Sequence, residues 1–452
     1  MSGFLFSAGA FVLALGVLIT VHEFGHYWVA RKAGVKVLRF SIGFGKPLWS
    51  RRRGPDQTEF VLAAIPLGGY VKMLDEREGP VAPEDLARAF NRQPVGKRMA
   101  VVVAGPAFNF VFAIVAYWAL FVHGVPGVKP LLDAPAPDSI AAVAGIEARD
   151  LLRAVDGTPT PTWDSAMLAL LDGALDRRRL ALEVESVDGR ARTVYIDLTG
   201  VDGLLDNGDL LDRLGLKPWR PVLPAVIDRL VPDGAAERAG LQPGDRILGA
   251  DGQAMDTWDA WVDYVQTRPE QPISVQIERD GVAQTLTVRP DRAEVDDSVI
   301  GRIGAYVRVP ENLGAELRTE TQYGPLAALQ QSLLKTWDMS VLTLRTLWKM
   351  LVGQASLDNI SGPISIAQYA GHSASIGLGT FLSFLAIVSI SLGVLNLLPV
   401  PVLDGGHLMY YLIELLKGTP VSEQTEIMGQ RIGIALLFAL SSWAVVNDFS
   451  LV

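Results

Sequence analysis

The chain has 452 residues, of which 49 are Asp or Glu and 40 are Lys or Arg, so its net charge is −9. This acidic balance excludes a protein that binds nucleic acid through clustered positive charge. The absence of cysteine excludes disulfides, thiolate metal ligands and a thiol nucleophile. A mean hydropathy of +0.27 beside 20% charged residues predicts that the apolar residues are gathered in long blocks, as in membrane proteins.

The first apolar block lies at the start of the chain. Residues 4–21 carry no charge, and the apolar pattern continues to Ala30, where Arg31 and Lys32 follow. This length is enough to cross a bilayer as a helix. The first residues contain no Lys or Arg and no A-x-A cleavage site follows, which favours a membrane span over a cleaved signal peptide.

A polar motif interrupts this block near its end, where residues 22–26 read H-E-x-x-H. On a helix, residues four apart share a face, so His22 and His26 can bind one zinc ion while Glu23 lies close enough to act as a general base. Polar groups inside a span are costly and usually mark a functional site. The motif therefore predicts a zinc site in the membrane.

The segment that follows the first span is basic and contains two predicted strands. Its Lys and Arg residues lie close to the apolar blocks, which predicts a cytoplasmic location and places both chain ends on the other side of the membrane. Residues 40–45 and 59–73 are apolar with glycine bends, and they predict a β-hairpin.

The second apolar block, residues 99–122, predicts another span. Gly105 and Ala107 allow a neighbouring helix to approach closely, and Asn109 is a polar group in lipid that needs a partner. We favour a role in helix packing for Asn109.

The region after the second span contains an internal repeat. Asp150 matches Asp245, and the Thr-Trp-Asp of residues 162–164 matches that of residues 257–259, always with an offset of 95 residues. The second copy reads A-G-L-x-x-G-D-x-I-L-x-x-D-G, and both copies resemble PDZ domains. The resemblance implies binding of an extended peptide at a sheet edge. Neither copy has a clear G-L-G-F-like loop, so two globular spacers that exclude bulky neighbours by size are an equally strong alternative.

An amphipathic helix is predicted after the repeat, because apolar residues recur every three or four positions from Leu326 to Leu351. Its two Trp and its basic residues suit a helix on the membrane surface, although packing beneath the second repeat would give the same pattern. Two more apolar blocks follow at residues 373–403 and 432–446. We predict both as spans, the shorter one relying on Arg431 at its end.

The third span ends in a motif that can complete the zinc site. Catalytic zinc needs three protein ligands, and residues 396–406 read N-x-x-P-x-P-x-x-D-G-G, in which Asp404 is the first acid after the apolar run. Both this span and the first one run toward the cytoplasm. Asp404 is therefore expected at the same depth as His22 and His26.

The two motifs on two such spans resemble the site-2 protease family of intramembrane zinc metalloproteases, closest to its bacterial members with two PDZ domains. The resemblance implies one Zn²⁺ held by His22, His26 and Asp404, with Glu23 as the general base. It also implies that Asn396, Pro399 and Pro401 line the substrate channel, and that the β-hairpin dips into the membrane. We expect an edge strand of this hairpin to pair with an unwound substrate near Ala63 and Ile65; the alternative is a peripheral cytoplasmic hairpin.

The predicted fold is a polytopic α-helical membrane protein with four transmembrane helices, a membrane-associated β-hairpin and two exported PDZ-like α+β domains. The predicted units are spans at 1–31, 99–123, 373–403 and 431–449, a cytoplasmic segment at 32–98, PDZ-like domains at 126–217 and 218–310, a connector with the amphipathic helix at 311–372, and a cytoplasmic loop or helix at 404–430.

These features and the resemblance together imply an intramembrane zinc endopeptidase of a bacterial inner membrane, with its active site near the cytoplasmic side and its PDZ-like domains in the periplasm. The resemblance implies single-span substrates that have first been cut on their exported side, such as an anti-sigma factor of the envelope-stress response, and leftover signal peptides. The alternative is an inactive membrane scaffold with structural zinc, but a scaffold has no use for Glu23 beside two ligands. A zinc transporter would need a charged path across the bilayer, which the spans lack.

Overall fold

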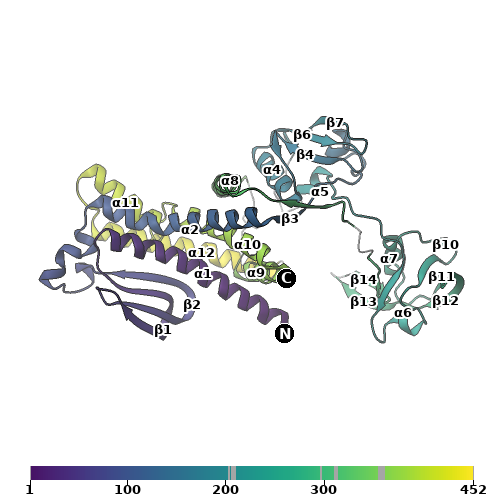
Figure 1. Cartoon of the computed structure of the whole chain (residues 1–452), viewed down its shortest axis with the longest axis horizontal. Helices are drawn as coiled ribbons and strands as arrows, with labels where there is room; N and C mark the ends of the chain where they lie inside the picture. Colours follow the sequence, from purple (N-terminus) through teal and green to yellow (C-terminus); the bar gives the residue numbers. More distant parts are fainter. Residues whose placement is uncertain are drawn as a thin grey trace.

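The computed structural model describes residues 2–201, 204, 210–295, 298–309, 314–354 and 362–450. Within these ranges, four helices are long and apolar enough to cross a membrane. Figure 1 shows them running together on one side of the molecule. They are α1 (Ser2–Lys32), α2 (Val95–His123), α10 (Leu378–Asn396) and α12 (Glu423–Ser450). The prediction of four helices able to span a membrane is confirmed.

The spans pack through small side chains. Ala113 and Ala116 of α2 are buried against Ile390 and Val394 of α10. A Cβ on Gly25 of α1 would collide with the backbone of α2, so the two helices are in direct contact. In lipid such close approach replaces the hydrophobic effect as the source of helix association.

The predicted third span, 373–403, is wrong at both ends. Its first residues belong to α9 (Pro363–Ile376), which ends at Gly377, where φ is 148°. Its last residues, 397–403, are not helical and lead into α11 (Asp404–Lys417). Pro399 and Pro401 have no backbone N–H and disfavour helix in the preceding residue, which explains the break. Hydropathy alone detects none of these interruptions.

The fourth span, predicted at 431–449, begins earlier, because α12 starts at Glu423. Its first turn, residues 423–426, is polar, so it carries no hydropathy signal although the helix is continuous there.

The predicted hairpin is a folded sheet. Strands β1 (Val37–Arg53) and β2 (Thr58–Met73) each bend into two arms. Phe40 pairs with both Val71 and Phe60, while Arg52 pairs with Glu59. The four arms therefore lie in the order 65–73, 37–44, 58–63 and 47–53. Figure 1 shows this sheet beside α1.

Three short 3₁₀ helices connect the hairpin to α2 within the described part of the chain. They are η1 (Glu76–Glu78), η2 (Pro83–Arg88) and η3 (Phe90–Arg92).

The sequence repeat is also a structural repeat. Each copy contains a four-stranded antiparallel sheet and one longer helix in the same chain order. The sheet orders are β5-β4-β6-β7 and β10-β9-β11-β12. In both copies the buried aspartate of the repeat pairs with an arginine, Asp150 with Arg192 and Asp245 with Arg279. The aspartates are at matched positions, whereas Arg192 comes from the fourth strand of its copy and Arg279 from the third strand of the other.

The elements of the first copy are α3 (Ile140–Val143), β4 (Leu151–Val155), β5 (Thr158–Pro159), α4 (Trp163–Asp176), β6 (Arg179–Glu185), β7 (Ala191–Asp197) and α5 (Leu210–Leu214). Those of the second are β8 (Ile227–Leu230), α6 (Ala235–Arg238), β9 (Arg246–Ala250), β10 (Gln253–Ala254), α7 (Trp258–Gln266), β11 (Ile273–Arg279), β12 (Val282–Val288), β13 (Asp291–Val295), β14 (Ser298–Arg302) and β15 (Ala305–Val307). The predicted boundary at residue 310 lies outside the described residues.

The predicted amphipathic helix is α8 (Pro325–Leu351), reached through the paired strands β3 (Val125–Val128) and β16 (Arg318–Thr321). Leu326, Trp337 and Trp348 are more than half exposed on it. Its Arg345 forms ion pairs with Asp172 and Asp176 of α4. This helix therefore connects the first repeat to the spans while presenting an apolar face.

Candidate active site

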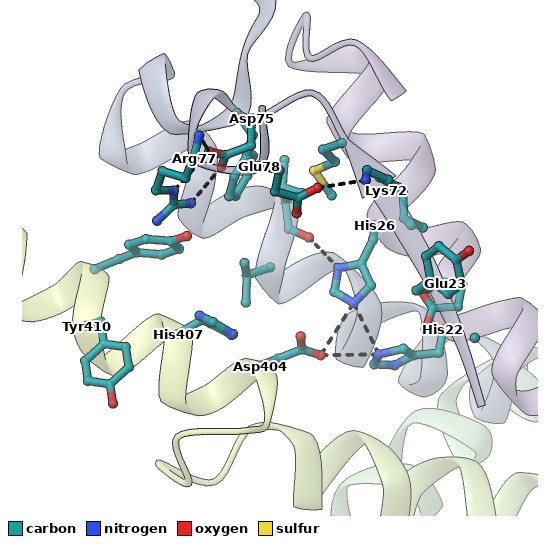
Figure 2. Close-up of a pocket in the computed structure, with 18 of the residues that line it drawn as sticks. His22, Glu23, His26, Lys72, Asp75, Arg77, Glu78, Asp404, His407 and Tyr410 are labelled. Carbon is teal, nitrogen blue, oxygen red and sulfur yellow. Dashed lines mark hydrogen bonds and ion pairs between the residues drawn. The ribbon is translucent and has the colours of Figure 1, made fainter. Parts of the chain in front are cut away.

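A cavity of about 630 Å³ lies where the spans meet the folded sheet. Figure 2 shows its side chains. It is lined by residues from six parts of the chain: α1, the edge arm of β2, the segment after β2, α2, α11 and α12. Its lining residues include His22, Glu23, His26, Gly69, Tyr70, Val71, Lys72, Met73, Asp75, Arg77, Glu78, Asp404, His407 and Glu426.

His22, His26 and Asp404 converge in this cavity. One ligand atom from each lies within 4.8 Å of the others. The Nε2 atoms of the two histidines are 3.2 Å apart, and Asp404 Oδ2 lies 3.3 Å from His22 Nε2 and 3.5 Å from His26 Nε2. The structure therefore brings together the two motifs that the sequence predicted to meet.

The three atoms fit a zinc ion. In a tetrahedral site with bonds of about 2.0–2.2 Å, ligand atoms lie about 3.3–3.5 Å apart, which matches the observed separations. Asp404 Oδ2 is buried and makes no hydrogen bond, so a cation would satisfy it. Two imidazoles and one carboxylate are also the kind of donor set that binds catalytic zinc and leaves one position open.

Both histidines are held from behind by α2. His26 Nδ1 donates a 2.8 Å hydrogen bond to the carbonyl of Val101, which leaves its Nε2 with a lone pair toward the cluster. His22 Nδ1 lies 3.2 Å from Asn109 Nδ2. A Cβ on Gly105 would collide with His26 Nε2 and lie 2.8 Å from Cε1 of His22, so only glycine leaves room for both rings. The sequence alone favours a packing role for Asn109 and does not predict this contact with His22.

Asp404 is the first residue of α11, and the two glycines after it determine how the chain reaches it. A Cβ on Gly405 would collide with the carbonyl of Leu398, and one on Gly406 would collide with the carbonyl of Val400. The non-helical segment 397–403 therefore folds back tightly over the first turn of α11. This contact fixes the end of the helix that carries Asp404.

Glu23 lines the same cavity, one residue after His22 on α1. Its Cγ would lie 3.0 Å from a Cβ on Gly69, so the edge arm of β2 passes directly beside it. A carboxylate in this place can reach a water molecule near the three converging atoms.

The remaining predicted site residues lie elsewhere. Asn396 ends α10, and neither it nor Pro399 nor Pro401 lines the cavity; Pro401 instead packs near Gly429 of α12. Ala63 is 6% exposed and lies in an interior arm of the sheet, so it is not on an edge. Ile65 is half exposed and begins the edge arm. The part of this arm that lines the cavity is residues 69–73.

Charged side chains line the part of the cavity that is formed by the end of β2 and the segment after it. Lys72 pairs with Glu78 at 3.0 Å, and Arg77 pairs with Asp75 at 2.7 Å. Burial would raise the pKa of the Asp75 carboxyl, but hydrogen bonds from Arg77 outweigh burial and hold this pKa below its ordinary value. His407, one turn beyond Asp404, also faces the cavity (Figure 2). Water thus has a polar approach to the cluster.

The chain resembles known proteins over its full length. A model of peptidase family M50 matches residues 10–440. The chain is 47% identical over 450 residues to a regulator of sigma E protease of Salmonella typhi and 46% identical over 450 residues to one of Escherichia coli strain K12, covering 100% of both chains in each pair. It is 44% identical over 455 residues to a putative zinc metalloprotease of Vibrio cholerae, again covering 100% of each. The chain therefore belongs to peptidase family M50, and it is an intramembrane zinc metalloprotease.

Proposed function

We propose that this protease cleaves single-span membrane proteins whose exported part has already been trimmed, with an anti-sigma factor and signal-peptide remnants as its substrates. The convergence of His22, His26 and Asp404 beside Glu23, at the end of a span, carries the proposal. The names of the relatives, which concern regulation of sigma E, support an anti-sigma factor as a substrate.

His22, His26 and Asp404 would hold the zinc ion. Zinc bound there supplies a Lewis acid that activates water and polarises the scissile carbonyl. Glu23 takes the proton from water on its carboxylate and passes it to the leaving amine. The charged side chains around Asp75 and Lys72 keep one side of the cavity polar, so that water reaches a site inside the membrane.

We place the protein in a bacterial inner membrane with both repeats in the periplasm. Many Lys and Arg residues lie between the first two apolar blocks, from the end of α1 to the start of α2, which favours a cytoplasmic location for the sheet. They include Arg31, Lys32, Lys36, Arg39, Lys46, Arg51, Arg52, Arg53, Lys97 and Arg98.

A reconstituted cleavage assay tests the function. Purified protein in proteoliposomes should cleave a single-span substrate that lacks a folded exported domain, and should cleave the untrimmed form at least about tenfold more slowly, a difference of about 1.4 kcal/mol in barrier. Incubation with a zinc chelator should stop cleavage, and added Zn²⁺ should restore it. Equal cleavage of both substrate forms would contradict the proposed dependence on trimming.

The second repeat offers a peptide-binding groove. We interpret both repeats as PDZ-like domains, and a cavity of about 400 Å³ in the second is lined by Trp258, Trp261 and Val262 of α7 and by residues 300–306. Strand β15 borders this cavity and, among the described residues, pairs only with β8. In the assay above, Val262→Arg should slow cleavage of the trimmed substrate if the groove binds it; an unchanged rate, with the untrimmed form still excluded, favours a size filter.

The edge arm of β2 is the surface that we propose for the unwound substrate. A helix cannot be hydrolysed until its backbone hydrogen bonds are replaced, and an extended peptide can add to a free strand edge. Residues 69–73 offer such an edge beside Glu23. This assignment moves the contact from Ala63, which is interior, to the arm that begins at Ile65.

Proline in this arm should reduce cleavage, because proline removes a backbone donor from the edge. Neighbouring residues of a strand direct their N–H groups to opposite sides, so Tyr70→Pro and Val71→Pro together test both sides. We expect at least a tenfold loss of activity, about 1.4 kcal/mol, with zinc content unchanged. Ser50→Pro, on the opposite edge arm, is the matched control. Full activity in both edge variants would refute the assignment.

A further inference from the structure

Asn109 of α2 approaches His22 from the side opposite to Asp404. Its side chain has no exposed surface, and its Nδ2 lies 3.2 Å from His22 Nδ1. Its Oδ1 is buried and has no hydrogen-bond partner. Its backbone carbonyl accepts a 2.9 Å hydrogen bond from the Oγ of Ser389 on α10. The amide is therefore fixed between two spans, with one buried polar atom unsatisfied.

The direction of the contact between Asn109 and His22 determines what His22 can bind. An amide N–H donates, so with Nδ2 toward Nδ1 the imidazole Nδ1 accepts and the ring hydrogen lies on Nε2. Yet Nε2 is the atom that faces Asp404 at 3.3 Å and His26 at 3.2 Å. A ring nitrogen that ligates a metal has to present a lone pair, so this tautomer of His22 does not suit zinc.

A half-turn of the amide about its last bond gives His22 the tautomer that ligation needs. The oxygen and nitrogen of an amide are nearly equal in size, so the turn leaves the packing unchanged. It brings Oδ1 to Nδ1, where it accepts the ring N–H, and it moves Nδ2 to the buried position that Oδ1 held. Nε2 of His22 is then left with its lone pair directed at the cluster. His26 already has the corresponding arrangement, because its Nδ1 donates to the carbonyl of Val101.

We propose that Asn109 is a positioning residue that holds His22 in the tautomer and orientation that ligate zinc. The inference rests on the proposed role of His22 as a ligand. It gives α2 a defined part in the site: Val101 orients one ring, Asn109 orients the other, and Gly105 leaves room for both. A partner that orients a ligating histidine in this way typically contributes a factor of about 10 to 100 in metal affinity.

Three variants of the full-length protein test this inference by zinc affinity, measured in competition with a chromophoric chelator. Asn109→Leu keeps the size of the side chain and removes the acceptor, and it should weaken zinc binding by about 10- to 100-fold. Asn109→Asp keeps an acceptor but has no donor, so it should bind zinc nearly as tightly as wild type. Ser389→Ala removes the hydrogen bond to the Asn109 backbone in the same helix contact, and it should leave zinc affinity unchanged.

The comparison separates positioning from packing. If Asn109 served only helix packing, Asn109→Leu would bind zinc as tightly as wild type, and Asn109→Leu and Ser389→Ala would lower the stability of the protein by the same amount. This result would overturn the inference. Equal losses in the Leu and Asp variants would also overturn it, because they would show that the amide acts as a donor. If the wild type itself bound no zinc, the proposed function would fail instead. The ring ¹⁵N shifts of His22 give a second readout, since the proton should lie on Nδ1 in zinc-loaded wild type.

Discussion

Glu23→Gln is expected to abolish cleavage while the fold and the zinc content stay as in wild type. The amide has the same shape as the carboxylate but cannot take a proton from water, and general-base catalysis contributes about 10²- to 10⁴-fold to a rate. Glu23 is not among the three converging ligand groups. The loss should therefore appear in the rate of peptide-bond hydrolysis and not in metal binding.

The measurement is single-turnover cleavage of a trimmed single-span substrate, with zinc determined in the same preparation. Glu426→Gln is the matched control, because Glu426 lines the same cavity from α12 but is not one of the clustered side chains. Cleavage by Glu23→Gln at a rate near that of wild type would remove the general-base assignment. Loss of zinc from this variant would mean that Glu23 acts as a ligand.

Asp404→Ala is expected to lose zinc as well as activity. Removal of a residue that only supports a ligand lowers metal affinity by about 10- to 100-fold, so removal of one of three ligands should lower it at least as much. In the wild type, Asp404 Oδ2 lies 3.3 Å from His22 Nε2 and 3.5 Å from His26 Nε2. In the variant the two imidazoles would remain, but this negative charge beside them would be lost.

Metal analysis after dialysis against a weak chelator is the direct test. Glu78→Ala provides the control, since this acid lines the same cavity, is largely exposed and pairs only with Lys72 among the ion pairs of the described residues. Undiminished zinc in Asp404→Ala would refute the assignment of the third ligand. Loss of zinc from Glu78→Ala to the same degree would point to a general effect of charge in the cavity.

Most of the fold follows from local patterns. Uncharged blocks of sufficient length predict spans, alternating apolar residues with glycine predict strands, and a constant offset predicts a repeat; the structure confirms each of these. The errors occur where hydropathy carries no information about the breaks between helices. Residues 373–403 are apolar throughout, yet Gly377 and the prolines divide them into two helices and an irregular segment.

The cavity could be predicted only in part. His22, Glu23, His26 and Asp404 were recognisable because their spacing or their place after an apolar run is rare by chance. Asn109 could be noticed because it is a polar residue inside a span. The sequence did not show that its partner is His22. The sequence could not show that Ala63 lies in an interior arm and that residues 69–73 lie on the edge. This depends on how the four arms of the sheet pair with one another, and the sequence of one strand does not specify that pairing.

The sequence by itself determined which segments enter the membrane, which residues can bind zinc and where the repeat lies, because hydropathy, helical spacing and residue chemistry are properties of short stretches. Only the tertiary structure decided that Val101 and Asn109 stand behind the two histidines, that Gly105 makes room for them and that residues 69–73 pass beside Glu23. These contacts join residues far apart in the chain, and they depend on how closely helices and strands approach one another. Close packing, which local composition does not specify, therefore determines the geometry of the active site.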